Sequence, residues 1–349
     1  MAHVRSRRAL LGMLAIVAGA ALSGCGGSSS GAAAPASSGA SAAAGSGSAS
    51  GGSSAGGSSA ASTTKVVVGV IPIIDVAPLY LGISKGIFTK HGLEVTAKPA
   101  QGGAAIVPAV LSGEDQFGFS NVVSLLTARD KGVPLISVAG GSSSTGDATS
   151  DVNAVLVAKG STLQSAKDLE GRKVAINSLN NIGDTTIKTA VKKAGGDPSK
   201  VRFVEIPFPD MPAQLASGTV DAVWESEPFR SQILAAGGRV LFDNLTETYP
   251  TLQIAQWFTS AKLKQEKPQL VADFTTAVNE AMTYATDHPD EARAVLATYT
   301  KIPPDVAAKV VLPKWPTTLD KESTTAIGEA ARAFGTLKKA PDVAGLLGG

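Results

Sequence analysis

Short apolar runs alternate with helical repeats from residue 66 onward. The β-branched run Val66–Val70 is bounded by turn residues, which is typical of a buried strand. A helix is expected to follow, with Asp75 as its cap and Pro78 in its first turn, and to end near Gly86. The alternation continues with strands at 93–96, 117–119 and 135–139 and helices at 103–111 and 122–131. These spacings predict strands that pair in parallel.

A polar loop at 140–151 precedes a second unit of the same kind. Its expected strands are 152–157, 173–176, 201–206, 220–224 and 240–242, and its expected helices are 184–194, 210–218 and 228–236. Residues 254–258 are predicted to return to the first unit as a strand. Helices are then expected from 270 to Pro289, at 304–311 and at 320–337, and together they form a helical tail.

The pattern therefore predicts the α/β class with two lobes. The first lobe comprises 65–151 and 256–349, and the second comprises 152–255. The chain crosses between the lobes twice, near 151–157 and near 250–258. Two crossings make a hinge with a cleft between the lobes, which is the usual place for a ligand.

The chain begins with a segment unlike either lobe. Residues 1–24 have the layout of a secretory signal peptide, because Arg5, Arg7 and Arg8 precede an apolar run. The adjacent arginines fit a twin-arginine export signal or a general secretion signal. Residues 26–62 contain only Gly, Ser, Ala and Pro, which cannot bury enough apolar surface to fold. We therefore interpret 25–64, from Cys25 onward, as a flexible tether.

Removal of the signal changes the charge of the chain. The 349 residues carry 31 basic and 29 acidic side chains, a net charge of +2. The signal takes three Arg and no acid with it, so the mature chain has 28 basic and 29 acidic residues and a net charge of −1. A nearly neutral chain argues against binding to nucleic acid through phosphate neutralisation.

The scarcity of Cys and His excludes several kinds of chemistry. Cys25 is the only cysteine, so the sequence excludes an intramolecular disulfide framework, a cysteine-cluster metal site and a cysteine-nucleophile enzyme. The mature chain has only His91 and His288, which makes a His-based metal site or catalytic triad improbable. We expect no cofactor and no metal.

Polar or glycine-containing turns follow five of the predicted strands. Open α/β sheets bind ligands at these carboxyl ends, where free N–H groups and the positive ends of helices meet. The candidate ligand-binding residues, with Tyr80 added from the first helix, are Ile74, Asp75, Tyr80, Gly102, Gly103, Ser120, Asn121, Asn177, Gly183, Asp184, Thr185, Trp224, Glu225 and Glu227. Helix capping is the alternative interpretation for Asp75 and Ser226. Trp224 is either a core residue between the lobes or a stacking platform.

Several segments resemble one protein family. They are APLYLG at 77–82, KGIF at 85–88, HGLEV at 91–95, SAKDLEGRKVA at 165–175, QLASGTVDAVW at 214–224 and EPF at 227–229. Their order resembles the substrate-binding proteins of ABC transporters for nitrate, sulfonates, taurine or thiamine pyrimidine precursors. The similarity runs from about Lys65 to residue 300. Separately, Leu22-Ser23-Gly24-Cys25 resembles a bacterial lipobox, which implies that Cys25 is lipidated and becomes the mature N-terminus.

The family resemblance implies a two-lobed periplasmic-binding fold of type II. Such a protein is a monomer that closes on a small solute outside the cell and docks on a permease with its ATPase subunits. The lipid on Cys25 would hold it to the outer face of the cytoplasmic membrane, with no other membrane contact. Two other classes stay open: an enzyme on the same fold, such as a pyrimidine-precursor synthase, and a sensor lipoprotein without a transporter. The export signal argues against the first of these, which is cytoplasmic.

The charge of the ligand depends on four acids in the candidate turns: Asp75, Asp184, Glu225 and Glu227. No Lys or Arg shares these turns. If two or more of the acids face the cleft, the ligand is expected to be neutral or cationic, for example an amine or a heterocycle over Trp224. If all four point outward, an anion held by the backbone N–H groups of Gly103 and Thr185 stays open.

Overall fold

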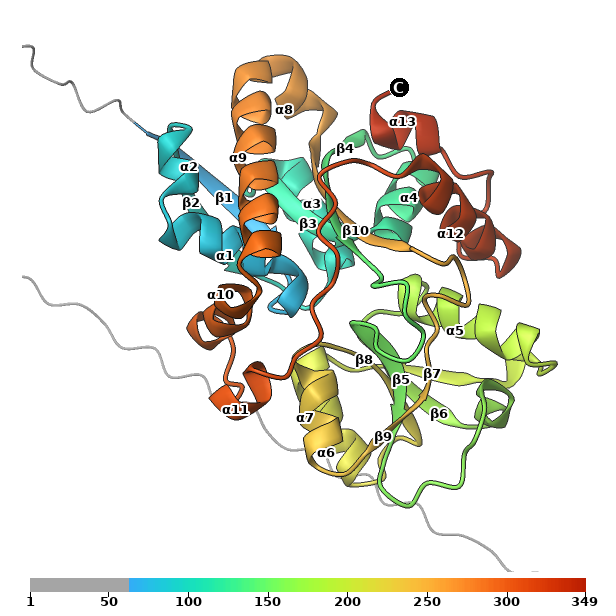
Figure 1. The fold of residues 1–349 in the computed structure, drawn as a ribbon. Coiled ribbons are helices and arrows are strands. Elements are labelled where there is room, and N and C mark those ends of the chain that lie inside the picture. The colour runs from blue at the N-terminus through green and yellow to red at the C-terminus, as the bar shows by residue number, and fades with distance from the viewer. Residues whose placement is uncertain (1–62) are drawn as a thin grey trace, which may run out of the picture. The chain divides into compact units, whose positions relative to one another are not determined.

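The computed structural model describes residues 63–349, which contain two five-stranded sheets with helices packed against them (Figure 1). Each sheet forms the centre of one lobe, as the sequence predicts. The signal segment 1–24, Cys25 and the tether as far as residue 62 lie outside the described residues, so they stay predictions.

The first lobe is built on a sheet with the strand order β2-β1-β3-β10-β4. Its strands are β1 (Thr64–Val70), β2 (Leu93–Pro99), β3 (Phe117–Asn121), β4 (Leu135–Ser143) and β10 (Gln253–Ser260). Its first helices are α1 (Ala77–Ser84), α2 (Ile87–Lys90), α3 (Gly103–Ser112) and α4 (Val122–Asp130). Strand β10 begins three residues before the expected boundary at residue 256, because Gln253 already pairs with Ser143 of β4.

The second lobe repeats this plan with the strand order β7-β6-β8-β5-β9. Its strands are β5 (Asn153–Val157), β6 (Lys173–Ile176), β7 (Arg202–Glu205), β8 (Ala222–Ser226) and β9 (Arg239–Phe242). Its helices are α5 (Ile182–Lys193), α6 (Met211–Ala216) and α7 (Phe229–Ala235). Asp210 occupies the N-cap position of α6, but it belongs to a 3₁₀ turn, Phe208–Asp210, and its side chain makes no cap hydrogen bond.

The strand pairing is only partly parallel, so the prediction of parallel pairing throughout is wrong. In each sheet the first three strands in the order pair in parallel, and the fourth is antiparallel to both of its neighbours, so four of the five strands run in the same direction. These inserted strands are β10 in the first lobe and β5 in the second. Each arrives directly from the other lobe, so it enters its sheet from the opposite end. Consequently β4 pairs with β10, not with β3.

The chain after β10 forms the predicted helical tail, although its details differ. Its helices are α8 (Ala261–Glu266), α9 (Pro268–Asp287), α10 (Pro289–Ala294), α11 (Pro304–Ala307), α12 (Lys321–Ala333) and α13 (Val343–Leu347). The helix expected at 304–311 ends at Ala307, and the helix expected at 320–337 ends at Ala333. Among residues 63–349, no helix is both long enough and apolar enough to cross a membrane.

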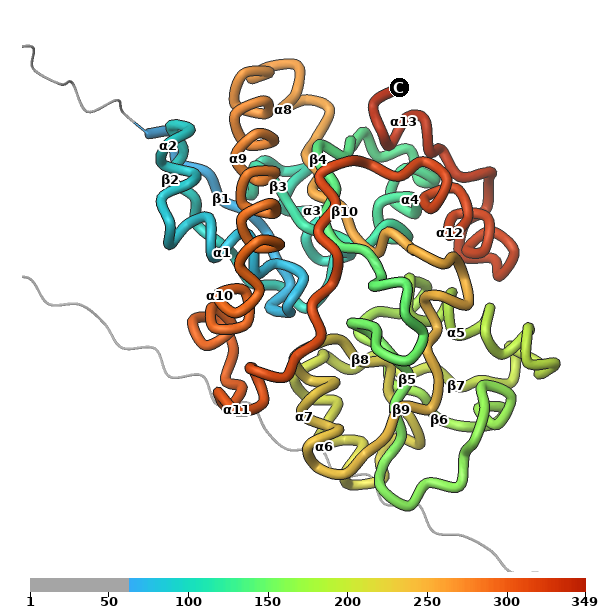
Figure 2. Tube along the Cα trace, viewed as in Figure 1, coloured from blue at the N-terminus to red at the C-terminus, as the bar shows by residue number. Residues whose placement is uncertain are grey.

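The tail does not stay on one lobe. Helix α11 packs against α7 of the second lobe, and α12 packs against α4 and α5. Figure 2 shows the segment between α11 and α12 as a red tube that runs from the second lobe back along the first. Within it, Lys314 exchanges two backbone hydrogen bonds with Ser143 at the end of β4. We call residues 308–320 the strap.

The core of the first lobe is organised around Phe274 of α9. Its ring is fully buried and stacks on Phe117 of β3, with 3.8 Å between ring centroids. The rings of Phe88 and Trp257 lie 6.1 and 6.2 Å away. The long tail helix is therefore held on the sheet by aromatic contacts that come from three separate parts of the chain.

The Phe274→Ala substitution is expected to lower the free energy of unfolding of the first lobe by about 3–5 kcal/mol, because it leaves a large cavity in a packed core. Urea denaturation followed by circular dichroism measures the change. Ile83→Ala is the matched control, since Ile83 is an exposed helical apolar residue, and it should stay within about 0.5 kcal/mol of the wild type. Equal effects of the two substitutions would contradict this account of the core.

Candidate functional site

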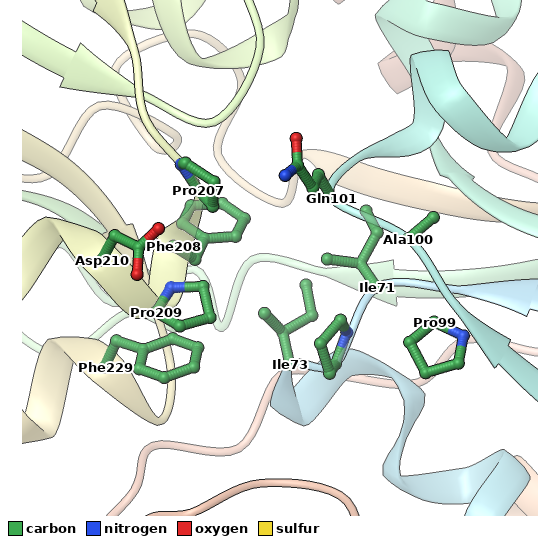
Figure 3. Close-up of a pocket in the computed structure, with 11 residues that line it drawn as sticks. Ile71, Ile73, Pro99, Ala100, Gln101, Pro207, Phe208, Pro209, Asp210 and Phe229 are labelled. Carbon is green, nitrogen blue, oxygen red and sulfur yellow. The ribbon is translucent and has the colours of Figure 1, made fainter. Parts of the chain in front are cut away.

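Two cavities lie where the lobes meet. The outer one has a volume of about 330 Å³, within the range of small-molecule sites. Figure 3 shows its two walls, with Ile71, Ile73 and Gln101 of the first lobe facing Phe208 and Phe229 of the second. Four of its lining residues are prolines, which have no backbone N–H: Pro72, Pro99, Pro207 and Pro209. The outer cavity is therefore largely apolar.

The inner cavity is smaller and has more polar residues in its walls. Its volume is about 20 Å³, which admits a small polar group but not a whole solute. Its walls share Ile71, Ile73 and Phe208 with the outer cavity, so the two spaces are neighbours. The polar residues that line it are Asp75, Asn121, Asn153, Asn177 and Trp224. We call the two spaces together the cleft.

Four of the fourteen candidate ligand-binding residues line the inner cavity: Asp75, Asn121, Asn177 and Trp224. The sequence interpretation missed Asn153, which is the first residue of β5, because only the carboxyl ends of strands were searched. Strand β5 runs antiparallel to β8, so its beginning lies beside the end of β8. The sequence does carry a signal for Asn153, because it is a single polar residue at the start of an otherwise apolar strand.

Asp75 lies in a 3₁₀ turn, Ile74–Val76, and does not cap a helix, so the capping interpretation is wrong. Its carboxylate accepts a hydrogen bond from Ser142 of the first lobe and one of 3.5 Å from Ser226 of the second. Ser226 likewise makes no cap, since the N-cap position of α7 is occupied by Pro228 and α7 has no side-chain cap hydrogen bond. Burial raises the pKa of Asp75 to about 6, although these hydrogen bonds oppose the shift.

Hydrogen bonds join the lobes on both sides of Asp75. The backbone N–H of Ile74 donates to the carbonyl of Glu227 at 3.0 Å. On the other side, Asn181 Nδ2 donates to Ser124 Oγ at 2.7 Å, and that hydroxyl also accepts from Asn121, which caps α4. Together with the bond from Ser226 to Asp75, this backbone bond and this small side-chain network connect the first lobe to the second.

Gly102 and Gly183 allow close approaches that a side chain would prevent. A Cβ atom on Gly102 would lie 2.8 Å from Ser178 Oγ and 3.2 Å from Asn177 Nδ2 across the cleft. A Cβ atom on Gly183 would lie 2.6 Å from the indole ring of Trp224. The absence of a side chain at Gly183 lets α5 rest on the ring, and this contact holds Trp224 in place at the cavity wall.

The other candidates occupy the surroundings of the cleft. Gly103 begins α3 against Ser120, whose hydroxyl donates to the carbonyl of Asn121 at 3.3 Å. Ile74 is fully buried. Tyr80 stacks on Tyr299 with 3.9 Å between ring centroids. Thr185 Oγ1 is buried without a hydrogen-bond partner within the described residues. Gly103, Ser120, Ile74, Tyr80 and Thr185 line neither cavity.

Three of the four candidate acids do not line the cleft, so the condition for an acidic cleft is not met. Asp184 closes a capping box with Asn181 and pairs with Lys188 at 2.9 Å. Burial raises the pKa of Glu225 well above its ordinary value. Glu227 is buried and pairs with Arg230 at 3.1 Å, and its pKa is raised by burial, which Arg230 opposes. Only Asp75 faces the inner cavity.

Glu227 ties three parts of the chain together. Its carboxylate accepts from Ser231 N and Oγ at 3.0 and 2.8 Å, and from Val311 N of the strap at 3.2 Å. Its backbone N–H donates to Val152 at the start of the second lobe, at 3.1 Å. Nearby, Trp315 Nε1 of the strap donates to the carbonyl of Asp75 at 3.0 Å. Glu227 thus connects the lobes and the strap.

The two chain crossings bring a pair of acids together at the hinge. Asp151, in the first crossing, accepts from the backbone N–H groups of Thr145 and Val152 and from the hydroxyl of Ser144. Asp243, in the second crossing, accepts from Leu245 and Thr246 through Oδ1, while its buried Oδ2 has no partner among the described residues. Burial, and then the charge of Asp151, raise the pKa of Asp243 to about 7.

This shift predicts a pH dependence of stability. The ordinary pKa of Asp243 is 3.8, so between pH 4 and 7 the folded protein holds a proton that the unfolded chain has lost. The contribution of Asp243 to stability is therefore full below pH 4 and is lost as the pH rises through 7. Asp243→Asn should be more stable than the wild type at pH 8, by on the order of 1 kcal/mol, and lose this slope. Urea denaturation at pH 5 and pH 8 measures both effects.

The control for this prediction is Asp287→Asn, which changes an exposed carboxylate at the end of α9. It should leave the difference between pH 5 and pH 8 unchanged. A wild-type protein that is more stable at pH 8 than its Asp243→Asn variant would overturn the assignment.

The described residues contain no group of three or more His, Cys, Asp or Glu side chains placed to hold a metal ion.

Comparison with known proteins places this cleft in a family. Residues 73–292 match the profile of the NMT1/THI5-like family, which is more than half of the chain. The chain belongs to the NMT1/THI5-like family. This chain resembles the formylaminopyrimidine-binding protein of Halalkalibacterium halodurans, with 25% identity over 223 residues. The match covers 63% of this chain and 65% of the relative. The match thus spans just under two thirds of that relative.

Further matches agree with the two-lobed fold. A putative thiamine biosynthesis protein of Haemophilus influenzae is 28% identical over 64% of this chain and 69% of its own. The solved sulphonate-binding protein SsuA of Escherichia coli superposes with a TM-score of 0.65 at 19% identity, over 81% of this chain and 96% of its own. For the nitrate-binding protein NrtA of Synechocystis the TM-score is 0.71 at 16% identity, over 80% and 84%. Both structures are periplasmic binding proteins, so the predicted fold is confirmed. The predicted family is confirmed by the match over residues 73–292.

Proposed function

We propose that this protein is the extracytoplasmic solute-binding component of an ABC importer. It captures a small solute in the cleft, the lobes close on it, and the loaded protein delivers it to a permease served by ATPase subunits. The observation that carries the proposal is the pair of cavities between the lobes, which are lined by residues from both. A solute that contacts both walls binds the closed form better than the open form, and this difference in affinity drives closure.

The comparisons support binding over catalysis. SsuA and NrtA are described as sulphonate- and nitrate-binding proteins, and the first relative as a binding protein for a pyrimidine. The name of the Haemophilus influenzae relative keeps an enzyme as the second candidate. The described residues that line the two cavities include no His, Cys, Lys or Arg. Proton transfer or nucleophilic attack in the cleft would therefore fall to Asp75 or Asp210, which makes catalysis the weaker candidate.

The proposed location of the protein rests on its first 25 residues. A charged segment, an apolar run and Leu22-Ser23-Gly24-Cys25 support export and lipidation of Cys25. The Gly/Ser/Ala tether would then join the lipid to β1 and keep the two lobes close to their membrane partner. The protein would act as a monomer. A tether of this kind raises the local concentration of the protein at the permease.

Locking the lobes together should abolish uptake of solute into the cleft. A Cβ atom on Gly102 would lie 4.0 Å from the Cβ atom of Ser178, which suits a disulfide bond. In the double variant Gly102→Cys/Ser178→Cys, the oxidised protein should fail to bind a solute that the reduced protein binds. Calorimetric titration with hydroxymethylpyrimidine, spermidine, taurine and nitrate measures this difference.

The two single variants, treated with the same oxidant, are the controls: neither can form this disulfide bond, so the solute binding of each should be the same before and after oxidation. Solute binding that survives oxidation of the double variant would show that solutes do not enter between the lobes. If neither the wild type nor the reduced protein bound any solute of the panel or of a metabolite extract, the proposed function itself would fail.

Replacing Cys25 should release the protein from the membrane. In a bacterial host that lipidates exported proteins, Cys25→Ser removes the thiol that receives the lipid, so the protein should move from the membrane fraction to the soluble extracytoplasmic fraction. Fractionation and labelling with a palmitate analogue measure the change. Ser28→Ala, three residues away in the tether, should leave the protein in the membrane fraction. A labelled Cys25→Ser variant would refute the anchor.

A further inference from the structure

Two buried polar atoms on the wall of the inner cavity have no partner among the described residues. They are Asn153 Oδ1 and Trp224 Nε1, and both side chains are 2% exposed. The amide of Asn153 is oriented by its Nδ2, which donates to the carbonyl of Glu225 at 3.4 Å. A buried polar atom without a partner costs free energy, so both atoms are suited to a group that enters the cavity.

The strand register brings these atoms to one spot. In the antiparallel pair of β5 and β8, Asn153 lies opposite Ser226 and Val155 lies opposite Trp224. Asn153 and Trp224 are therefore diagonal neighbours on the same face of the sheet, within reach of one small group. Asn153 Oδ1 only accepts a hydrogen bond and the indole N–H only donates one. A group that satisfies both must carry a donor and an acceptor side by side.

The outer cavity adds requirements on the rest of the solute. Its walls are Pro, Ile and Phe side chains, and the prolines remove backbone donors from the mouth. No Lys or Arg among the described residues lines either cavity, whereas Asp75 and Asp210 do. An anion would therefore enter without a partner of opposite charge and would meet two carboxyl groups. An apolar or aromatic body, by contrast, buries its surface against these walls.

We infer that the cleft selects an uncharged solute whose amide-type head group, with a carbonyl or ring nitrogen beside an N–H, bonds to Asn153 and Trp224 while an apolar body fills the outer cavity. The inference rests on the proposed solute-binding function and names its class of solute. The head group accepts from Trp224 Nε1 and donates to Asn153 Oδ1. Sulfonate-like and nitrate-like anions are excluded by the same walls.

Three probes that differ only in the head group test the inference. Benzamide, benzamidinium and benzoate share one aromatic ring, but their head groups are a neutral donor–acceptor pair, a cation with donors only, and an anion with acceptors only. Titrated into the wild-type protein at pH 7.5, benzamide should bind at least about tenfold more tightly than either ion. Tighter binding of benzamidinium would show that the charge of Asp75 selects the solute, and tighter binding of benzoate would show an anion site. Either result overturns the inference.

Variants of the two residues should weaken benzamide binding by about tenfold each. Trp224→Phe removes the indole N–H and keeps an aromatic ring, and Asn153→Leu removes the acceptor at similar volume. The controls are Trp257→Phe and Asn279→Leu, which also remove buried atoms without partners among the described residues but line neither cavity. Thermal melting verifies that each variant is folded. Equal losses in the variants and their controls would refute the assignment.

A third variant keeps the test decisive if the first two fold poorly. Asn153→Asp retains an oxygen acceptor and adds a negative charge, so it should shift the preference from benzamide toward benzamidinium by at least about tenfold. An unchanged preference would refute contact between Asn153 and the head group. Failure of the inference and failure of the proposed function are distinguishable. Binding of taurine or nitrate in place of benzamide refutes the inference alone, whereas a protein that binds no solute of either panel or of a metabolite extract refutes the function.

Discussion

The insertion of one antiparallel strand into each sheet is the constraint on which the cleft depends. Strand β5 enters the second sheet, and β10 the first, directly from the opposite lobe. Both crossings are therefore anchored by hydrogen bonds to two neighbouring strands, so the hinge is tied into both cores. The insertion also places Asn153 beside Trp224, because only an antiparallel strand starts where its parallel neighbours end. Hinge and site thus have one structural origin.

Electrostatics in the cleft follow from burial more than from the number of acids. Asp184 pairs with Lys188, four residues later, and Glu227 pairs with Arg230, three residues later. Glu225 has none, and burial favours its neutral form. A candidate set with four acids therefore presents one carboxyl group to the inner cavity, that of Asp75, which burial also shifts toward neutrality. This is why a count of acids in the sequence could not decide the charge of the site.

The sequence predicted most strands and helices and the division into two lobes, because apolar periodicity is local. It did not predict which strands are neighbours, since the position of β10 between β3 and β4 depends on contacts more than 100 residues apart in the chain. The same limit explains Asp75. A carboxyl group before a helix is usually a cap, but Ser142 and Ser226, both distant in sequence, compete for it here. Asn153 was missed for a related reason, because its role depends on the direction of its strand.

The strap gives the hinge a mechanical limit. The chain leaves the first lobe at α10, contacts α7 of the second lobe through α11 and bonds to Glu227 through Val311, then returns to β4 at Lys314. Only Leu312 and Pro313 separate Val311 from Lys314, so this tie has almost no slack. The lobes therefore cannot swing far apart on this side unless the tie to Glu227 breaks. The lobes therefore open on the side away from the strap, which acts as a third connection beside the two chain crossings.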